Sequence, residues 1–263
     1  MLDTRSITAT LRLIREKTVK MLSSDGNATL KKCYLKLATF CSTYGFSPPF
    51  SAKAEKSEQG WRMQSADSRD RNPNLYTKYD ETIDFLFQDV LGFLDSDSCI
   101  LEIGCNAGRS LDYLYKKGYT NLTGIEIGAE AEKAMQQTFP QAYRSTHYIL
   151  GNAYEELAKL PEKKFDLVFC HSVLVNITPR WNGVFKEMAR VSKKYILILE
   201  NEGSLYAYPR DFERMFKKAG YRQILYKFYS SMVQSGRMEL KSPFTPSDLF
   251  RNNVVRLFVE EKH

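Results

Sequence analysis

Strand-like and helix-like segments alternate along the middle of this sequence, and this alternation limits its fold more than any other feature. Short apolar runs predict strands at residues 99–103, 122–127, 147–150, 165–170 and 195–200. Segments with apolar residues at helical spacing lie beside them, at residues 79–94, 109–117, 129–138, 154–160 and 181–191. Such alternation predicts a parallel sheet that is covered by helices on both faces.

The C-terminal part of the chain follows a different order. A helix is predicted at residues 211–219, and the strands predicted at 222–229 and 254–260 have no helix between them. Two consecutive strands without a crossover helix pair in antiparallel fashion. The expected fold class is therefore α/β: a doubly wound, seven-stranded and mostly parallel sheet with an antiparallel C-terminal hairpin.

The N-terminal part is helical at first and then irregular. Amphipathic helices are predicted at residues 6–22 and 28–41, whereas residues 42–74 are polar and contain several prolines. We expect residues 1–75 to form a helical N-terminal extension and lid, and residues 76–263 to form the α/β domain. The apolar helix faces predict packing on the protein's own core or on a second copy in a homodimer, with a membrane surface as the weaker alternative.

Cysteine usage and hydropathy restrict the compartment and the kinds of site. The five cysteines form no C-x-x-C pair and there are three histidines, so we expect neither a disulfide framework nor a metal site. The sequence has no run of eighteen apolar residues, and its start, M-L-D-T-R-S-I-T, lacks the apolar region of a signal peptide. We therefore expect a cytoplasmic protein without a membrane span.

The formal net charge of +7 is unevenly distributed along the chain. Residues 1–75 carry +6, residues 76–203 carry −4 and residues 204–263 carry +5. Basic flanks can attract nucleic acid or a phosphorylated partner. Because no arginine-rich run, zinc finger or aromatic nucleic-acid motif accompanies them, we interpret the flanks as solvated surface and expect no nucleic-acid partner.

A glycine turn follows the first strand of the alternating region, in the stretch C-I-L-E-I-G-C-N-A-G-R-S-L at residues 99–111. A strand that ends in such a turn and opens a helix presents free backbone N–H groups at the positive end of the helix dipole. This arrangement suits an anionic or adenosine-containing cofactor. The dinucleotide fingerprint G-x-G-x-x-G is absent, because Asn106 and Arg109 stand where its second and third glycines would be.

Polar residues stand at the ends of the neighbouring strands, where ligands of such sheets bind. Glu126 ends the second strand, twenty-two residues after Gly104, and its carboxylate can accept hydrogen bonds from both hydroxyls of a ribose. The sequence G-N-A follows the third strand at residues 151–153. The fourth strand reads F-D-L-V-F-C-H-S and the fifth reads Y-I-L-I-L-E-N-E.

These motifs, in this order, resemble those of a class I S-adenosylmethionine-dependent methyltransferase over roughly residues 76–203. The resemblance implies a Rossmann-like domain with S-adenosylmethionine as cofactor, whose methionine part is wrapped by E-I-G-C-N-A-G and whose ribose is bound by Glu126. It also implies that Asn152 and Ala153 flank adenine, and that His171 lies beside both cofactor and acceptor. Asn106 departs from the commoner middle glycine of the loop, and Asn152 departs from a frequent aspartate.

Segments outside this common core, which we expect to lie over the site, add further candidates. The segment at residues 60–79 offers aromatic side chains and an arginine that can hold the cofactor carboxylate or an anionic substrate. The expected cofactor-binding residues are Trp61, Arg62, Tyr76, Glu102, Gly104, Cys105, Asn106, Gly108, Glu126, Ile127, Asn152, Ala153, Cys170 and His171. Packing on the core is an equal alternative for Trp61 and the tyrosines, and both cysteines are interpreted as apolar fillers rather than nucleophiles.

A second motif points to a different acceptor. Residues 47–50 read S-P-P-F, which resembles the motif that amino-methyltransferases of nucleic-acid bases use to hold the target nitrogen. Here it follows a helical segment, lies in a proline-rich loop and competes with C-H-S-V at the end of the fourth strand. We therefore do not expect base modification.

Methyl transfer needs alignment of the acceptor, exclusion of water and, for a hydroxyl, removal of a proton. His171 is the first candidate base, with cofactor packing as the alternative role, and Glu200 and Glu202 come next. Two further segments outside the core, at residues 201–210 and 230–244, are expected to lie over the site. Their basic and aromatic residues suit a small-molecule acceptor that can be anionic, such as a sugar, a phosphorylated intermediate or a natural product. We favour O-methylation over N-methylation. RNA or protein methylation is the alternative, followed by a non-catalytic cofactor-binding subunit.

Overall fold

The computed structural model describes residues 28–49, 54–65, 67, 71–202, 208–228 and 253–261. The helix predicted at residues 6–22 and the segment at 230–244 lie outside the described residues. Residues 203–207 of the segment at 201–210 also lie outside them.

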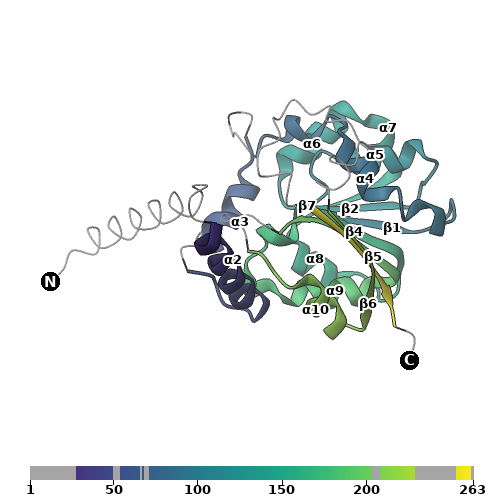
Figure 1. Cartoon of the computed structure of the whole chain (residues 1–263). Helices are drawn as coiled ribbons and strands as arrows, with labels where there is room; N and C mark the ends of the chain where they lie inside the picture. The colour runs from purple at the N-terminus through teal and green to yellow at the C-terminus, as the bar shows by residue number, and fades with distance from the viewer. Residues whose placement is uncertain are drawn as a thin grey trace.

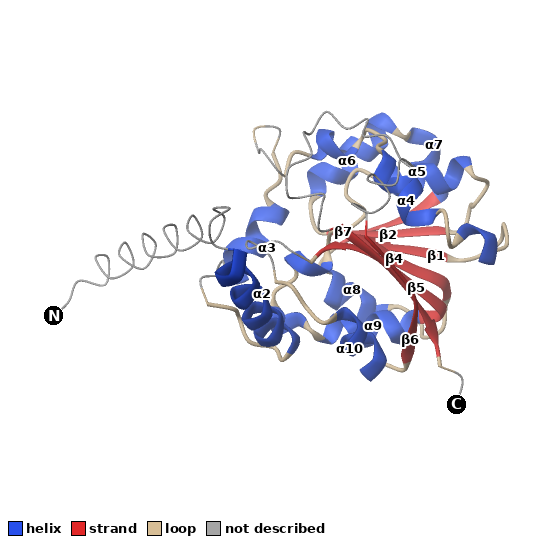
Figure 2. Ribbon diagram, viewed as in Figure 1, coloured by secondary structure: helices blue, strands red, loops and turns tan. Residues whose placement is uncertain are grey.

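The described strands form one seven-stranded sheet in the order β3-β2-β1-β4-β5-β7-β6 (Figures 1 and 2). Neighbours among the first five strands pair in parallel, and β7 is antiparallel to both β5 and β6. This confirms the predicted fold class. The strands are β1 (Ile100–Ile103), β2 (Leu122–Glu126), β3 (Thr146–Leu150), β4 (Phe165–His171), β5 (Ser192–Asn201), β6 (Tyr221–Phe228) and β7 (Asn253–Glu260).

Helices cover both faces of this sheet (Figure 2). Figure 2 shows α4 to α7 on one face, α8 to α10 on the other, and α2 and α3 at the sheet edge where β1 to β5 end. The described helices are α2 (Ala28–Thr43), α3 (Ala54–Arg62), α4 (Glu81–Phe87), α5 (Arg109–Lys116), α6 (Ala129–Thr138), α7 (Pro140–Ser145), α8 (Ala153–Lys159), α9 (Gly183–Val191) and α10 (Phe212–Lys218). Short 3₁₀ helices lie at Pro73–Tyr76, Leu91–Phe93, Leu174–Asn176 and Pro179–Trp181.

Two apolar cores hold these layers together, one on each face of the sheet. Side chains alternate between the faces of a strand, so Leu101 and Ile103 of β1 lie in the core under α8 and α9, while Ile100 lies in the other core. Every residue of β1 and β2 is buried. These central strands are therefore fixed in position, and their carboxyl ends form a rigid edge.

Three elements differ from the predictions. The helix predicted at residues 79–94 is shorter: Asp80 caps α4 by accepting a hydrogen bond from Thr82 N, and after Phe87 the chain turns and continues as a 3₁₀ helix. Helix α7 was not predicted; it begins at Pro140, a position that favours a helix start, but is too short to show a clear period. Helix α3 lies inside the segment interpreted as irregular.

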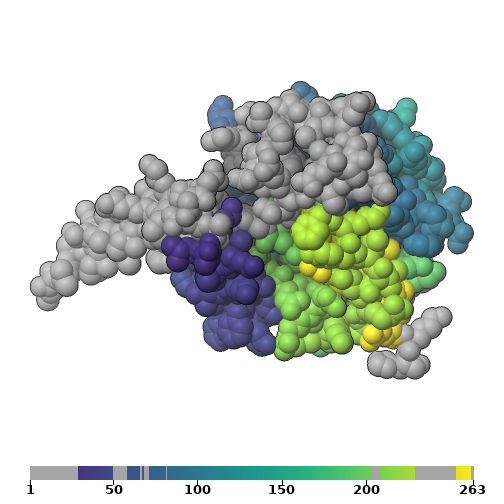
Figure 3. Space-filling view, viewed as in Figure 1, coloured from purple at the N-terminus to yellow at the C-terminus, as the bar shows by residue number. Residues whose placement is uncertain are grey.

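The C-terminal end of α2 is attached to the layer of α9 and α10. Asn182 Nδ2 donates a hydrogen bond to Ser42 O at 2.7 Å, and Asp211 N donates to Thr43 Oγ1 at 2.9 Å. Figure 3 shows the purple atoms of α2 beside the green atoms of this layer. Among the helices that the structure describes, none combines the length and apolar character needed to cross a bilayer. The proposed domain boundary at residue 75 stays a prediction.

Candidate functional site

The turn between β1 and α5 is built around two glycines with left-handed backbones. Gly104 has φ +69° and Gly108 has φ +76°, a region that favours glycine. A Cβ at Gly104 would overlap the side chain of Val173, and a Cβ at Gly108 would overlap Met135. Both positions therefore need glycine for conformation and for space, and the backbone between them lies close to the ends of β2 and β4.

Asn106 takes the place of a glycine without breaking the turn. Its φ is +46°, and asparagine tolerates this left-handed region better than most residues. Its side-chain oxygen accepts a hydrogen bond from Ala107 N at 2.8 Å, and its backbone N–H donates to Glu126 Oε2 at 2.9 Å. The substitution noted in the sequence therefore keeps the shape of the loop and connects it to the end of β2.

Glu126 is held at the end of β2 by the backbone around it. Besides the N–H of Asn106, its carboxylate accepts a hydrogen bond from Gly128 N at 2.9 Å, while Gln64 Nε2 lies 3.5 Å from Oε1. The side chain is 5% exposed, and burial raises its pKa although the backbone donors, including Ile127 N, oppose this effect. The result is a buried acceptor of fixed direction, which suits a diol.

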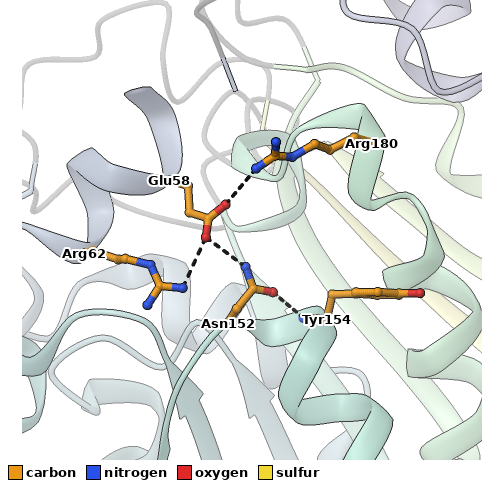
Figure 4. Close-up of polar contacts among 5 residues, drawn as sticks. All are labelled: Glu58, Arg62, Asn152, Tyr154 and Arg180. Atoms are coloured by element: carbon orange, nitrogen blue, oxygen red, sulfur yellow. Dashed lines mark hydrogen bonds and ion pairs between the residues drawn. The ribbon is translucent and has the colours of Figure 1, made fainter. Parts of the chain in front are cut away.

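The side-chain amide of Asn152 directs its oxygen to the helix and leaves its N–H groups for a ligand. It is the N-cap of α8, and its side-chain oxygen accepts a hydrogen bond from Tyr154 N at 2.9 Å. Its Nδ2 lies 3.4 Å from Glu58 Oε1 (Figure 4). Ala153 begins α8 and packs against the apolar core below it. An adenine placed here would accept a hydrogen bond from Asn152 through a ring nitrogen.

Three other expected residues lie beneath the site. Burial raises the pKa of the Cys105 and Cys170 thiols well above the ordinary value, so both stay neutral, and their side chains belong to the two apolar cores. Glu102 is 2% exposed, and burial raises its pKa as well. Its Oε2 has no hydrogen-bond partner among the described residues, which leaves one buried acceptor or donor below the glycine turn.

His171 ends β4 next to a partly buried ion pair. Arg109 Nη1 donates to Asp80 Oδ2 at 2.6 Å and to Lys78 O at 3.2 Å. Burial and the charge of Arg109 lower the pKa of His171 to about 3, and the charge of Asp80 opposes this shift. The imidazole is therefore neutral at pH 7. Asp80 was not identified from the sequence, where it looks like an ordinary helix cap.

The other two candidate bases, Glu200 and Glu202, are held by contacts within the protein. Glu200 is fully buried, and its carboxylate accepts hydrogen bonds from the backbone N–H groups of residues 173–175 at 2.8 to 3.2 Å. Glu202 forms a two-pronged pair with Arg256, with N···O distances of 2.7 and 2.9 Å. Both carboxylates are occupied by structural contacts, so we assign neither of them proton transfer.

The candidates of the N-terminal part lie in two places. Arg62, at the end of α3, donates to Glu58 at 3.2 Å, and Trp61 lies under the guanidinium of Arg71 at 5.5 Å. Tyr76 instead faces Arg109, at 5.9 Å from its ring centre to the guanidinium carbon. Glu58 thus connects Arg62 to Asn152, whereas Tyr76 contacts Arg109, the residue whose charge acts on His171.

Two residues at the site, Glu58 and Gln64, were missed in the sequence. Glu58 contacts Asn152, and Gln64 contacts Glu126, across sequence separations of 94 and 62 residues. Neither belongs to a motif, and only the packing of α3 over the ends of β2 and β3 brings them here. The polar, aromatic composition of residues 60–79 gave a weak signal that this part of the chain covers the site.

The residues present fit an adenosine-containing cofactor. The turn requires glycine at two positions, Glu126 offers fixed acceptors, and Asn152 offers donors. Glu102 and Gln64 each place a buried, unpaired oxygen at this edge of the sheet among the described residues.

Comparison with known proteins supports this interpretation. Residues 101–197 match the family model described as "Methyltransferase domain". These residues run from β1 into β5 and include Glu126, Asn152 and His171. In sequence, no curated protein matches the chain.

Solved structures show where this fold occurs. Magnesium protoporphyrin IX methyltransferase from Synechocystis PCC 6803, with S-adenosylmethionine bound, is 13% identical at a TM-score of 0.53 and covers 81% of this chain and 93% of its own. A TehB-like S-adenosylmethionine-dependent methyltransferase from Corynebacterium glutamicum is 19% identical at a TM-score of 0.50, with coverages of 79% and 98%. The [4+2]-cyclase SpnF is 12% identical at a TM-score of 0.51, and the match covers 76% of this chain and 85% of SpnF. Because one neighbour is a cyclase, the fold alone does not fix the chemistry.

Proposed function

We propose that this chain, which has the class I methyltransferase fold and a methyltransferase domain at residues 101–197, uses S-adenosylmethionine to methylate a small-molecule acceptor. One observation carries the proposal. Glu126 ends β2 and Asn152 follows the neighbouring parallel strand β3, beside a turn that needs glycine at two positions, and both side chains have the polarity that ribose and adenine require.

The chain's own residues account for cofactor binding. Glu126 would hold the ribose hydroxyls, Asn152 would donate to adenine, and the backbone of the glycine turn would contact the methionine part. When bound, S-adenosylmethionine supplies a methyl group on a positively charged sulfur. The protein then has to orient the acceptor, exclude water and take up a proton if the acceptor is a hydroxyl.

His171 is the residue that we propose for proton uptake. Its neutral state at pH 7 allows it to accept a proton, and the nearby Asp80 carboxylate would stabilise the imidazolium that forms. The positive charge of Arg109 opposes this, so the imidazole is a weak base in the structure. Proton transfer would therefore accompany formation of the new bond to carbon, because the acceptor oxygen becomes more acidic as that bond forms.

The surroundings of the site favour a small acceptor. Helix α3 lies over the ends of β2 and β3, at the opening through which an acceptor would enter. Arg62 and Arg180 both lie near this opening with side chains 45% and 47% exposed, so an acceptor with a negative group would find cations. We favour a hydroxyl as the acceptor because His171 can remove its proton.

Calorimetry with S-adenosylhomocysteine tests the cofactor part of the proposal. We expect binding by the unaltered protein and a loss of affinity of about tenfold to a hundredfold in Glu126→Ala, because hydrogen bonds to a carboxylate are lost. An absence of binding in both proteins would contradict the proposal.

Incubation of cell extract with methyl-labelled donor identifies the acceptor class. We expect label in the small-molecule fraction. Label in RNA or protein would support the alternative, and steep salt-dependent competition by bulk RNA would point to RNA. Binding without labelling of any fraction would favour a non-catalytic subunit.

A further inference from the structure

Both residues proposed to recognise adenosine are in contact with a single stretch of chain. This stretch, residues 54–65, comprises α3 and the residues after it, and we call it the covering segment. Glu58 Oε1 lies 3.4 Å from Asn152 Nδ2, and Gln64 Nε2 lies 3.5 Å from Glu126 Oε1. The two contacts lie at the ends of the adjacent strands β3 and β2.

The polarity of each contact matches that of adenosine. The oxygen of Asn152 caps α8, and its Nδ2 meets an acceptor in the Glu58 carboxylate, as it would in an adenine ring nitrogen. Glu126 can only accept, and it meets a donor in the Gln64 amide, as it would in a ribose hydroxyl. Glu58 and Gln64 thus present the same kinds of atom as the ligand.

The two sets of contacts exclude each other in space. Gln64 is 5% exposed and lies directly on Gly128, where even a Cβ would overlap its amide. A ribose that reaches the Glu126 carboxylate needs the volume that this amide fills. Gln64 Oε1 is buried without a hydrogen-bond partner among the described residues, so the closed arrangement leaves one polar atom unsatisfied.

The contacts that hold the covering segment are weak enough to be exchanged. Both contacts to the recognition residues are at the long limit of hydrogen bonding. Figure 4 shows Glu58 between Arg62, on its own helix, and Arg180, on the 3₁₀ helix at Pro179–Trp181. The Arg180 pair has an N···O distance of 3.3 Å and a half-exposed arginine, and such pairs contribute little.

We propose that the covering segment is an internal competitor of the cofactor, in which Glu58 and Gln64 occupy Asn152 and Glu126 until adenosine displaces them. This inference rests on the proposed function. It implies that the binding-competent state is a fraction of the ligand-free protein, and that removing the two side chains raises that fraction and therefore the apparent affinity.

Calorimetry on a double variant, Glu58→Ala with Gln64→Ala, tests the competition directly. We expect S-adenosylhomocysteine to bind about three- to tenfold more tightly than to the unaltered protein, since the fraction able to bind increases. Glu162→Ala is the matched control: Glu162 is exposed and lies just before β4, at the opposite edge of the sheet. We expect this variant to bind like the unaltered protein.

Hydrogen exchange on the unaltered protein gives a second test that needs no variant. We expect S-adenosylhomocysteine to speed exchange of the α3 amides by at least about threefold while it slows exchange at residues 104–108 and 126–128. Weaker binding by the double variant, or slower exchange in α3, would show that the covering segment assists binding, and unchanged binding would show that it does not compete. Each of these results would overturn the inference. If the unaltered protein and both variants fail to bind, the proposed function itself fails.

Discussion

Glu200 and Arg210 both hold the backbone of the loop after β4, Glu200 through its N–H groups and Arg210 through its carbonyl oxygens. The Glu200 carboxylate accepts hydrogen bonds from the N–H groups of residues 173–175, while the Arg210 guanidinium donates to the carbonyl oxygens of Leu174 and Ile177 at 2.7 and 2.6 Å. Both side chains are buried. Because His171 immediately precedes this loop, the pair fixes the position of the proposed base through the loop backbone.

Replacing Glu200 should therefore destabilise the protein more than an ordinary surface change. In Glu200→Ala the N–H groups of residues 173–175 lose their acceptor, and the positive charge of Arg210 loses the nearby negative charge of Glu200. We therefore expect a decrease in the free energy of unfolding of about 3 kcal/mol. Urea unfolding measures this decrease. Glu155→Ala is the control, because Glu155 is exposed, and a decrease of similar size in both variants would contradict the anchoring role of Glu200.

The low pKa of His171 predicts a loss of stability in acid. Its pKa is lowered to about 3 in the folded protein, against about 6.5 when unfolded. The unfolded state therefore takes up the proton first, so this contribution to stability is complete above pH 6.5 and is lost as the pH falls from 6.5 toward 3. Since the side chain is only half-buried, we expect it to account for about 2 kcal/mol between pH 7 and pH 4.

The measurement compares urea unfolding of the unaltered protein and His171→Asn at several pH values. Glu200 acts in the opposite direction: burial raises its pKa to about 7, so its contribution is complete below the unfolded value of 4.5 and is lost as the pH rises from 4.5 to 7. Subtracting the His171→Asn curve removes this term, because both proteins contain Glu200.

The sequence was most informative where one local pattern decides the structure. Buried strands such as Ile100–Ile103 are short apolar runs, and Gly104 with Gly108 marks the turn, so the central sheet and the Glu126 position could be predicted. Contacts between distant segments could not. Glu200 resembles any polar strand end until the loop at residues 173–175 folds back onto it. Glu58 and Gln64 are polar residues of no motif until α3 and the residues after it pack over the ends of β2 and β3.

Gly104→Ala should remove cofactor binding. The added Cβ meets Val173 and forces an alanine into a left-handed backbone, which costs about 1–2 kcal/mol before any overlap is counted. Gly118→Ala is a matched control, because Gly118 also has a positive φ, +95°, but has open space around its Cα. We expect both variants to lose stability in urea, and only Gly104→Ala to lose affinity for S-adenosylhomocysteine in calorimetry. Equal affinities would show that the turn does not contact the ligand.

Asn152 tests the direction of the hydrogen bond to adenine. An aspartate in its place would cap α8 equally well, because a carboxylate can accept from Tyr154 N, but Asn152→Asp removes the donor that we assign to the adenine contact. We therefore expect Asn152→Asp to bind S-adenosylhomocysteine about tenfold more weakly and to melt at a slightly lower temperature, because its carboxylate faces that of Glu58. Asn152→Ala should also lose about 1 kcal/mol of stability, since the cap is lost. Tighter binding by the aspartate variant would mean that position 152 accepts from the adenine amine instead of donating to the ring.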